Sequence, residues 1–326
     1  MSDLVKGTAG GGQLTPLRIG RAYDAAEGIR AFELMSVDGG ELPSFTPGAH
    51  VKVCVPNGAL RKYSLCNDPA DRSHYLIAVK RDAQGQGGSM SLVDHAKVGD
   101  TLLIGAPENA FPLVQDAKLS LFIAGGIGIT PILSMIRSFG EVPPQPWKLF
   151  YFTRNPQSTA FLQELSVSPL HLQMNIHHDD GDPAKAFDLW SVLEKANTAH
   201  IYCCGPKSLM DSVRDMTGHW SPANVHFESF YEGGGVNAGD QPFTLTLKKS
   251  AQTFEVPVGK TILTVLREHG FALASSCERG TCGTSTPSLI SGEADHRDYV
   301  LMPEEEASQI MICVSRAKST ELVLDL

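Results

Sequence analysis

The apolar and polar residues of the chain follow two distinct patterns along its first two thirds. Between residues 15 and 115, short segments such as IRAFELMSV (29–37) and HVKVCVP (50–56) alternate apolar and polar positions, which is typical of half-buried strands. Many short strands separated by glycine and proline predict a small antiparallel β-barrel. One short helix is expected near GSMSLVDHA (88–96).

The pattern changes between residues 116 and 231 to apolar strands that alternate with short helices. LSLFIAGG is followed by a helix near Pro131, and WKLFYFTR by AFLQEL. HLQMNIHH is followed by LWSVLEKA, and HIYCCG by PKSLMDSVRDM. This order predicts an α/β domain with a parallel sheet covered on both faces. Because ligands of such sheets bind beyond the carboxyl ends of the strands, function is expected at 125–130, 153–154 and 204–206.

The last part of the chain predicts a small α+β unit at residues 242–326. It begins with a hairpin (242–259), continues with a helix ending at Gly270, and closes with strands IMICVSRA (310–317) and ELVLDL (321–326). Residues 232–241, EGGGVNAGDQ, are rich in glycine and predict a flexible linker, and residues 1–14 predict a mobile tail. The sequence therefore predicts a multidomain chain.

Composition narrows the class of function. Hydrophobic residues make up 42% of the 326 residues, and the formal net charge is −9. This profile indicates a globular protein, argues against a nucleic-acid partner and leaves room for a partner with basic contact surfaces. The 18 uncharged residues 119–136 contain glycines and a proline, so they indicate a strand, a turn and a helix rather than a membrane span.

The cysteine pattern and the first residues indicate a cytoplasmic protein. The amino-terminal residues MSDLVKGTAGGGQ lack the apolar core of a secretory signal. The chain has an odd number of cysteines, which argues against a disulfide framework and for reduced thiols. They are Cys54, Cys66, Cys203, Cys204, Cys277, Cys282 and Cys313.

The segment SSCERGTCGTS (275–285) carries a metal-ligand spacing with one departure. Cys277 and Cys282 are spaced like the first two ligands of a plant-type [2Fe–2S] site, which has the pattern C-x4-C-x2-C followed by a distant cysteine. Ser285 stands where the third cysteine is expected, and Cys313 is the distant one. A pair of structural thiols in a loop is the alternative.

Two further segments suit a flavin and a nucleotide. In RKYSL (61–65), an arginine could bind phosphate, a tyrosine could pack on a ring and a serine could reach a ring nitrogen. Gly87, Gly88 and Ser89 stand at an expected helix start, where free N–H groups favour phosphate. AGGIGITP (124–131) is a strand, a glycine turn and a helix start, although it departs from G-x-G-x-x-G. An ordinary strand and tight helix–sheet packing are the alternatives.

These segments together resemble one family. SSCERGTCGT, SGEADHRD and MICVSRA closely resemble the ferredoxin domain of the phthalate dioxygenase reductase family. RKYS, GGIGITP and CGP resemble the flavin and pyridine-nucleotide motifs of the ferredoxin reductase superfamily. The resemblance covers about residues 15–326. It implies an FMN-binding β-barrel domain (15–115), an NAD-binding α/β domain (116–231) and a β-grasp ferredoxin domain (242–326).

The resemblance also implies the site residues. For FMN they are Arg61, Lys62, Tyr63, Ser64, Val79, Lys80, Gly87, Gly88, Ser89, Thr130 and Phe230. For NADH they are Gly125, Gly126, Gly128, Thr130, Thr153, Arg154, Cys204, Gly205 and Pro206. Ser64, Cys204 and Phe230 would lie nearest the reacting rings, and HHDDG (177–181) is interpreted as a polar loop bordering the nucleotide. For the cluster they are Cys277, Cys282 and Cys313, with Ser285 at the altered position.

Ser285 leaves several outcomes open. An alkoxide can bind Fe(III), but a serine hydroxyl is a far weaker acid than a thiol, whose pKa is ~8.5. A cluster with this ligand is expected to have a lowered reduction potential, and partial occupancy or loss of the cluster is equally compatible with the residue. The intact flanking residues favour an engineered or variant position, and a natural serine-ligated cluster is the alternative.

The resemblance implies a reductase component of a Rieske non-haem iron oxygenase system in aromatic catabolism. Electrons would pass from NADH through FMN and a [2Fe–2S] cluster to the terminal oxygenase, with no membrane partner. One alternative is a cluster-impaired reductase that passes electrons from NADH to flavin or another acceptor. Another is a redox sensor that uses flavin and the cluster, although the sequence carries no recognisable DNA-binding or signalling domain.

Overall fold

The computed structural model describes residues 13–167, 171–230, 236–237 and 239–326. It packs as two compact units, one running up to Asp188 with Thr198–Cys204, the other formed by Leu189–Asn197 and Gly205–Leu326. Residues 1–12 of the expected tail (1–14) and residues 232–235 and 238 of the expected linker (232–241) lie outside the described residues. Within the described part of the chain, every helix is too short or too polar to cross a bilayer.

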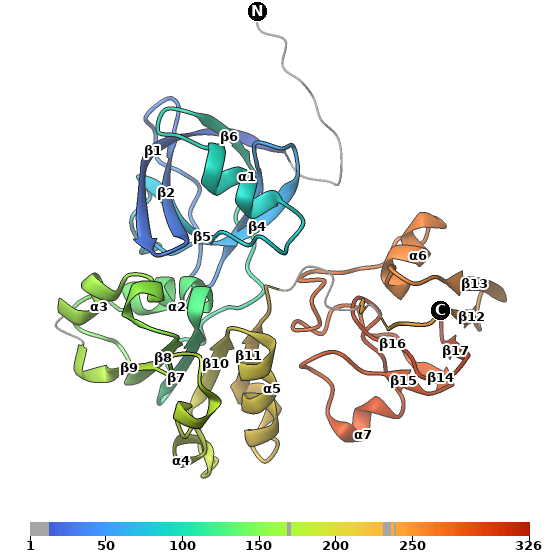
Figure 1. Cartoon of the computed structure of the whole chain (residues 1–326). Helices are drawn as coiled ribbons and strands as arrows, with labels where there is room; N and C mark the ends of the chain where they lie inside the picture. Colours follow the sequence, from blue (N-terminus) through green and yellow to red (C-terminus); the bar gives the residue numbers. More distant parts are fainter. Residues whose placement is uncertain (1–12, 168–170, 231–235, 238) are drawn as a thin grey trace, which may run out of the picture. The chain divides into compact units, whose positions relative to one another are not determined.

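The first unit begins with the predicted antiparallel barrel (Figure 1). Six strands form one sheet in the order β4-β3-β6-β1-β2-β5, and a bridge between Leu65 and Ile77 joins its two ends. The alternating apolar residues fill its interior, where Phe32, Leu34 and Val51 are fully buried. The elements are β1 (Thr15–Ala26), β2 (Ile29–Ser36), β3 (His50–Cys54), β4 (Leu60–Ser64), β5 (His74–Lys80), α1 (Gly88–His95) and β6 (Thr101–Ile104).

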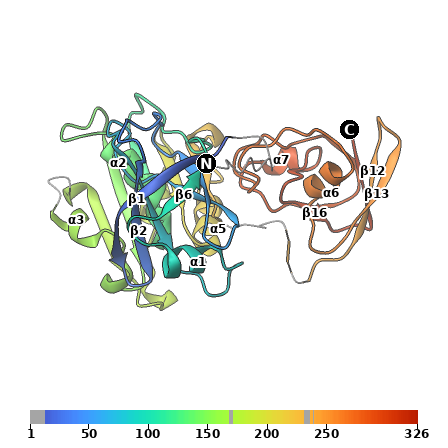
Figure 2. The same ribbon diagram turned by 90° about the horizontal axis from the view of Figure 1, so that it is seen from above.

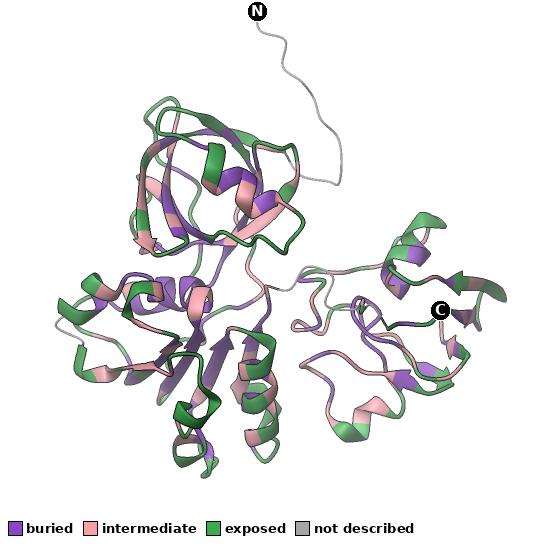
Figure 3. Cartoon of the chain, viewed as in Figure 1, coloured by how far each residue is buried: buried purple, intermediate pink, exposed green. Residues whose placement is uncertain are grey.

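The predicted parallel sheet follows, with the strand order β11-β10-β7-β8-β9. Its central strands, β7 and β10, are almost wholly apolar after their first residue and are buried, as Figure 3 shows. The elements are β7 (Ser120–Gly125), α2 (Ile129–Arg137), β8 (Trp147–Thr153), α3 (Leu162–Val167), β9 (Met174–His178), α4 (Trp190–Leu193), β10 (His200–Cys204), α5 (Lys207–Met216) and β11 (Val225–Glu228).

Two expectations for this region need adjustment. Residues 119–136 form the expected strand, glycine turn and helix, but the helix begins at Ile129, two residues before Pro131. The helix expected in LWSVLEKA is only the single turn Trp190–Leu193. Leu189 and Leu193 are buried, but residues 194–198 are all exposed, so the apolar face of the segment ends with Leu193.

The α+β part of the second unit is a mixed sheet with the order β13-β12-β17-β14. β12 pairs antiparallel with β13 and parallel with β17, which is a β-grasp arrangement, and α6 lies beside β12 and β13 in Figures 1 and 2. Phe243, Leu245 and Leu247 share the buried face as expected. The elements are β12 (Phe243–Leu247), β13 (Gln252–Val256), α6 (Ile262–Glu268), β14 (Leu289–Ser291), β15 (Ala294–Asp295), α7 (Pro303–Glu306), β16 (Arg316–Ala317) and β17 (Glu321–Leu324).

The strand predicted for IMICVSRA is wrong except for its last two residues, which form β16. The backbone turns at Met311, whose carbonyl accepts hydrogen bonds from the N–H groups of Val314 (3.1 Å) and Ser315 (2.9 Å). Cys313 therefore lies in a turn and not in a strand. The apolar run is buried because it packs into the core of the α+β part, which satisfies the same hydrophobic pattern without a strand.

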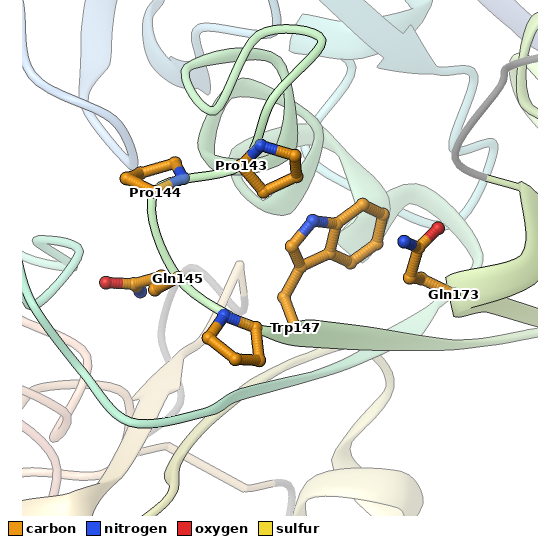
Figure 4. Close-up of a pocket in the computed structure, with 6 residues that line it drawn as sticks. Pro143, Pro144, Gln145, Trp147 and Gln173 are labelled. Carbon is orange, nitrogen blue, oxygen red and sulfur yellow. The ribbon is translucent and has the colours of Figure 1, made fainter.

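One surface hollow of about 330 Å³ lies at the amino-terminal end of β8 (Figure 4). This is the edge of the sheet opposite to the carboxyl ends at which the nucleotide site is expected. The hollow is therefore separate from the candidate site. Its lining residues are Pro143, Pro144, Gln145, Pro146, Trp147 and Gln173.

Candidate functional site

Arg61 and the glycine pair after β5 meet in the barrel. The Arg61 guanidinium donates to the side chain of Gln86 at 3.0 Å, and Gly88 lies directly under its stem. A Cβ atom on Gly88 would stand 2.7 Å from Arg61 Nε, so a larger residue there would displace the Arg61 side chain. The structure therefore brings together two predicted segments that are distant in the sequence, whereas Gln86, which orients Arg61, was not predicted.

The start of α1 is suited to an anion. Its N-cap residue, Gly87, has φ 80°, and no side chain caps the first turn. The Ser89 hydroxyl oxygen accepts a hydrogen bond from the N–H of Asp82 at 3.1 Å. Since the first N–H groups of a helix have no partner within it and carry its positive dipole end, this turn with Arg61 can hold a phosphate.

The remaining predicted flavin residues of the barrel differ in exposure. Ser64 is buried and Lys62 and Tyr63 are half-buried at the end of β4, while Lys80 is exposed at the end of β5. The Val79 side chain lies in the barrel core and is 1% exposed. Val79 can therefore offer a ligand its main chain but not its side chain, because strand alternation turns that side chain inward.

The predicted nucleotide edge is formed by the carboxyl ends of adjacent parallel strands. Cys204 of β10 pairs with Ala124, and Gly125 of β7 pairs with Phe152, so the three strand ends lie side by side. Gly126 has φ 53°, and nothing lies within 4 Å of the position of its missing Cβ. The open turn at Gly126–Gly128 leaves room for a ligand to approach the main chain closely.

Hydroxyl groups stiffen this edge. The Thr130 hydroxyl donates to the carbonyl of Ile127 at 3.0 Å. The Thr153 hydroxyl forms hydrogen bonds with the Thr159 hydroxyl (2.6 Å) and with the His178 ring (2.9 Å). Arg154 is exposed, and its guanidinium has no ion-pair partner among the described residues. Arg154 is thus the available cation at this edge.

The loop HHDDG borders Thr153 and Arg154, as expected. The N–H of Asp180 donates to the Arg154 carbonyl at 2.7 Å, and the Asp180 carboxylate pairs with Lys185 at 2.8 Å. His177 hydrogen-bonds the carbonyl of Lys185 at 2.7 Å. The side chains of His177 and Asp180 are therefore engaged within the loop.

The two adjacent cysteines of β10 are both fully buried. Burial raises the pKa of the Cys203 thiol, which makes it an inert core group. Cys204 is the last residue of the strand, and Gly205 and the N-cap residue Pro206 link it to α5. Burial also raises the pKa of the Cys66 thiol to about 12, whereas Cys54 is half-buried.

Phe230, the aromatic expected to stack on the flavin, is half-buried at the end of the described segment after β11. The preceding residue, Ser229, accepts a hydrogen bond through its carbonyl from the Arg279 guanidinium at 3.0 Å. Arg279 belongs to the loop with the ligand cysteines. This link between the two predicted segments had no signal in the sequence.

The cysteine loop is shaped by residues with positive φ. Glu278 (φ 58°), Gly280 (φ 71°) and Gly283 (φ 74°) turn the backbone repeatedly between Cys277 and Ser285. At Gly280 a Cβ would stand 2.6 Å from Val314 Cγ2 and 3.0 Å from the Cα of Asp298. This glycine is therefore required both for its dihedral angles and for the close approach of the loop to its support.

Backbone N–H groups point at the cysteine sulfurs. The N–H groups of Arg279 and Thr281 lie 3.4 and 3.5 Å from Cys277 Sγ, and the N–H of Cys277 lies 3.4 Å from Cys282 Sγ. The N–H of Gly280 donates to Cys313 Sγ. Donors of this kind stabilise thiolates and tune the potential of an iron–sulfur cluster.

The four predicted cluster positions form two pairs. Cys277 and Cys282 share a hydrogen bond that lowers the pKa of Cys282 and raises that of Cys277. The Ser285 hydroxyl hydrogen-bonds Cys313, opposing the rise that burial causes in the pKa of this thiol. Among the described residues, no group of three His, Cys, Asp or Glu side chains is placed to hold a single ion. Two pairs of donors suit a two-iron cluster.

The loop is fixed from outside by residues that sequence reasoning missed. Arg267 of α6 pairs with Glu278 at 2.8 Å and hydrogen-bonds Ser275. The buried Asp298 carboxylate accepts the N–H groups of Val300 (3.0 Å) and Leu301 (2.8 Å) behind Gly280. These contacts are visible only in the folded chain, because no sequence pattern distinguishes Arg267 and Asp298 from other charged residues.

Two family matches fall on these regions. Residues 122–215 match the oxidoreductase NAD-binding domain, and residues 245–318 match the 2Fe-2S iron-sulfur cluster binding domain. Phthalate dioxygenase reductase of Burkholderia cepacia is 51% identical over 314 residues, which cover 95% of this chain and 97% of that protein. The chain belongs to the phthalate dioxygenase reductase family.

Two further proteins are similar to this chain over nearly its whole length. The carnitine monooxygenase reductase subunit of Escherichia coli (strain K12) is 39% identical over 323 residues, covering 96% of this chain and 99% of that protein. A solved phthalate dioxygenase reductase, described as a modular structure for electron transfer from pyridine nucleotides to [2Fe-2S], is 50% identical. It matches with a TM-score of 0.70 over 96% of this chain and 98% of that chain.

Membership of the phthalate dioxygenase reductase family confirms several predictions. The fold class, the oxidoreductase activity and the role as the reductase of an oxygenase system are as expected. The predicted set of cofactors, FMN and a [2Fe–2S] cluster with NADH as electron donor, is confirmed with them. The chain therefore carries electrons to an oxygenase partner, and the two alternatives, an impaired reductase and a sensor, are not favoured.

Proposed function

We propose that the terminal partner is a Rieske-type oxygenase and that electrons reach it through the loop at 277–285. The observation that carries the proposal is the set of N–H groups that already point at the three cysteine sulfurs. A loop ordered in this way is suited to a one-electron carrier, since a [2Fe–2S] cluster passes one electron at a time and bound flavin accepts two.

The flavin end rests on Arg61 and the start of α1. Arg61 and the N–H groups at Gly87–Ser89 would hold the phosphate, which the contact of Arg61 with Gly88 supports. Tyr63 and Ser64 would fix the ring, with the main chain of Val79 and Lys80 beside it. Thr130 and Phe230 complete the proposed set, with Phe230 stacking on the ring.

The nucleotide end rests on the carboxyl edge of the parallel sheet. The open turn at Gly125, Gly126 and Gly128 would take the pyrophosphate, and Cys204, Gly205 and Pro206 would border the nicotinamide. Thr153 and Arg154 would contact the adenosine half. The exposed guanidinium of Arg154, without an ion-pair partner among the described residues, supports this assignment.

The cysteines support the proposed cellular compartment, and the net charge supports the proposed partner surface. None of the seven cysteines, all of them among the described residues, forms a disulfide, which supports a reducing compartment, the cytoplasm. The net charge of −9 supports an oxygenase with a basic contact surface, and complementary charge would mainly speed their encounter.

Anaerobic mixing tests this proposal. The protein reduced with NADH is mixed with oxidised phthalate dioxygenase, a chosen Rieske-type probe, and the visible band of the Rieske centre is followed. We expect that band to bleach in a reaction that slows as salt rises. Rapid reduction of ferricyanide and cytochrome c without any bleaching of the Rieske band would contradict the choice of partner.

A further inference from the structure

Ser285 lies on the same side of the loop as Cys313. Its carbonyl accepts a hydrogen bond from the N–H of Ile312 at 3.1 Å, and the carbonyl of Pro287 accepts one from Ile310 at 3.2 Å. These two bonds hold the loop segment against the turn that carries Cys313. This register brings Ser285 next to the residue that follows Ile312, which is Cys313.

Burial separates Ser285 from an ordinary loop serine. Ser285 and Cys313 are each 4% exposed, whereas the neighbouring Thr284 is exposed. The Thr284 hydroxyl serves the other pair, since the Cys282 thiol lies 3.3 Å from it. Thus the adjacent hydroxyl residues Thr284 and Ser285 lie beside different cysteines. Thr284 lies beside Cys282, which already has Cys277 as a neighbouring ligand, whereas Ser285 lies beside Cys313, which has no second cysteine next to it.

We infer that Ser285 Oγ is the fourth protein ligand of the cluster and binds the same iron as Cys313. Cys277 and Cys282 would bind the other iron. This inference rests on the proposed function and deepens it. On binding, the Ser285 O–H bond breaks, an Oγ–Fe(III) bond forms, and the proton leaves to solvent, as is usual when a protonated side chain becomes a metal ligand.

An oxygen ligand changes the properties of the cluster in a defined direction. Oxygen is a harder donor than thiolate and favours Fe(III) over Fe(II). The N–H donors to Cys277, Cys282 and Cys313 are the same with serine or cysteine at position 285, so the change of donor atom is the difference that acts on the potential. The cluster of this chain is therefore harder to reduce than the same cluster with cysteine at position 285.

Four versions of the full chain separate this role from a structural one. They are the native protein, Ser285→Cys, Ser285→Ala and the control Ser288→Ala. Ser288 is exposed and stands three residues from Ser285, so its substitution makes the same chemical change outside the donor pairs. Iron and acid-labile sulfide per chain, the electron paramagnetic resonance spectrum after dithionite reduction, and the reduction potential are measured for each.

The expected results differ for each version. Native protein and Ser288→Ala carry two irons and two sulfides per chain and share one spectrum. Ser285→Cys has the same iron content with a different spectrum, and its reduction is favoured at least tenfold, which is ~59 mV for one electron. Ser285→Ala loses at least half of its iron, or retains it with a spectrum distinct from both.

Two results would overturn the inference. One is a native protein without iron when Ser285→Cys holds two, because Ser285 then fails as a ligand. The other is an identical spectrum and potential for native protein and Ser285→Ala, because the fourth ligand is then another group. Reduction of ferricyanide by NADH, measured on the same samples, reports the flavin half alone, so loss of the proposed function is recognised separately.

Discussion

The flavin-phosphate cradle at Arg61 and Gly87–Ser89 and the cysteine loop at 277–285 use different atoms to bind their groups. The cradle offers main-chain N–H groups and one cation, which several sequences could supply. The loop offers side-chain donors at four fixed positions, supported by N–H groups aimed at sulfur. A changed side chain therefore has graded consequences in the cradle, whereas in the loop it changes the ligand itself.

The largest effect is expected where the loop has no space. Gly280→Ala requires a residue with a Cβ at φ 71° and pushes that atom against Val314 and Asp298. Strain of ~1–3 kcal/mol and overpacking of ~1–3 kcal/mol together predict a loss of about 2–6 kcal/mol in the unfolding free energy of this unit. Urea unfolding and iron content measure the change.

A matched glycine controls for backbone strain alone. Gly39 has φ 75° and nothing within 4 Å of its missing Cβ, so Gly39→Ala carries the dihedral cost without the collision. We expect Gly39→Ala to keep its full iron content. Equal destabilisation by the two variants would show that the loop is less tightly supported than its contacts indicate.

A smaller effect is expected in the cradle. Arg61→Ala removes one charged donor but leaves the N–H groups at Gly87–Ser89, so binding weakens without being lost. A charge-assisted hydrogen bond contributes ~1.5–3 kcal/mol, which predicts FMN affinity about 10- to 100-fold weaker. Fluorescence titration of apoprotein with FMN measures this. Arg18→Ala, an exposed arginine of the same barrel, is expected to bind FMN normally, and normal binding by Arg61→Ala would remove Arg61 from the site.

The smallest effect is expected at the edge of the nucleotide site. Arg154→Ala removes an exposed cation that would contact the non-reacting half of NADH. We expect KM for NADH to rise about 3- to 10-fold with kcat unchanged, because such a contact is equal in ground and transition states. Lys148, an exposed cation at the other end of β8, provides the control. A fall in kcat without a change in KM would place Arg154 nearer the reacting atoms.

The sequence predicted the architecture because hydrophobic period and layer arrangement are directly linked. Alternating apolar and polar residues predicted the barrel, and apolar strands that alternate with helices predicted the parallel sheet. The same reasoning failed at 310–317, where an apolar run is equally satisfied by a buried turn. The sequence named Val79 as a flavin residue without showing that its side chain is buried in the barrel, because the facing of a strand residue depends on its register.

The candidate site was predictable as a set of residues but not as an arrangement. Spacing identified Cys277, Cys282, Ser285 and Cys313, yet their division into two pairs depends on positive φ at Glu278 and on the bond from Ile312 to Ser285. Neither has a sequence signal. The domain boundaries and the role of each site residue remain predictions.

One measurement tests the central claim most directly. The native protein is titrated anaerobically with NADH, and the visible spectrum is followed to its end point. Uptake of three electrons per chain, with both the flavin and the iron–sulfur bands bleached, is the result expected of a reductase whose cluster works with Ser285. Uptake of two electrons with only flavin bands present would contradict it, since the chain would then lack its one-electron exit.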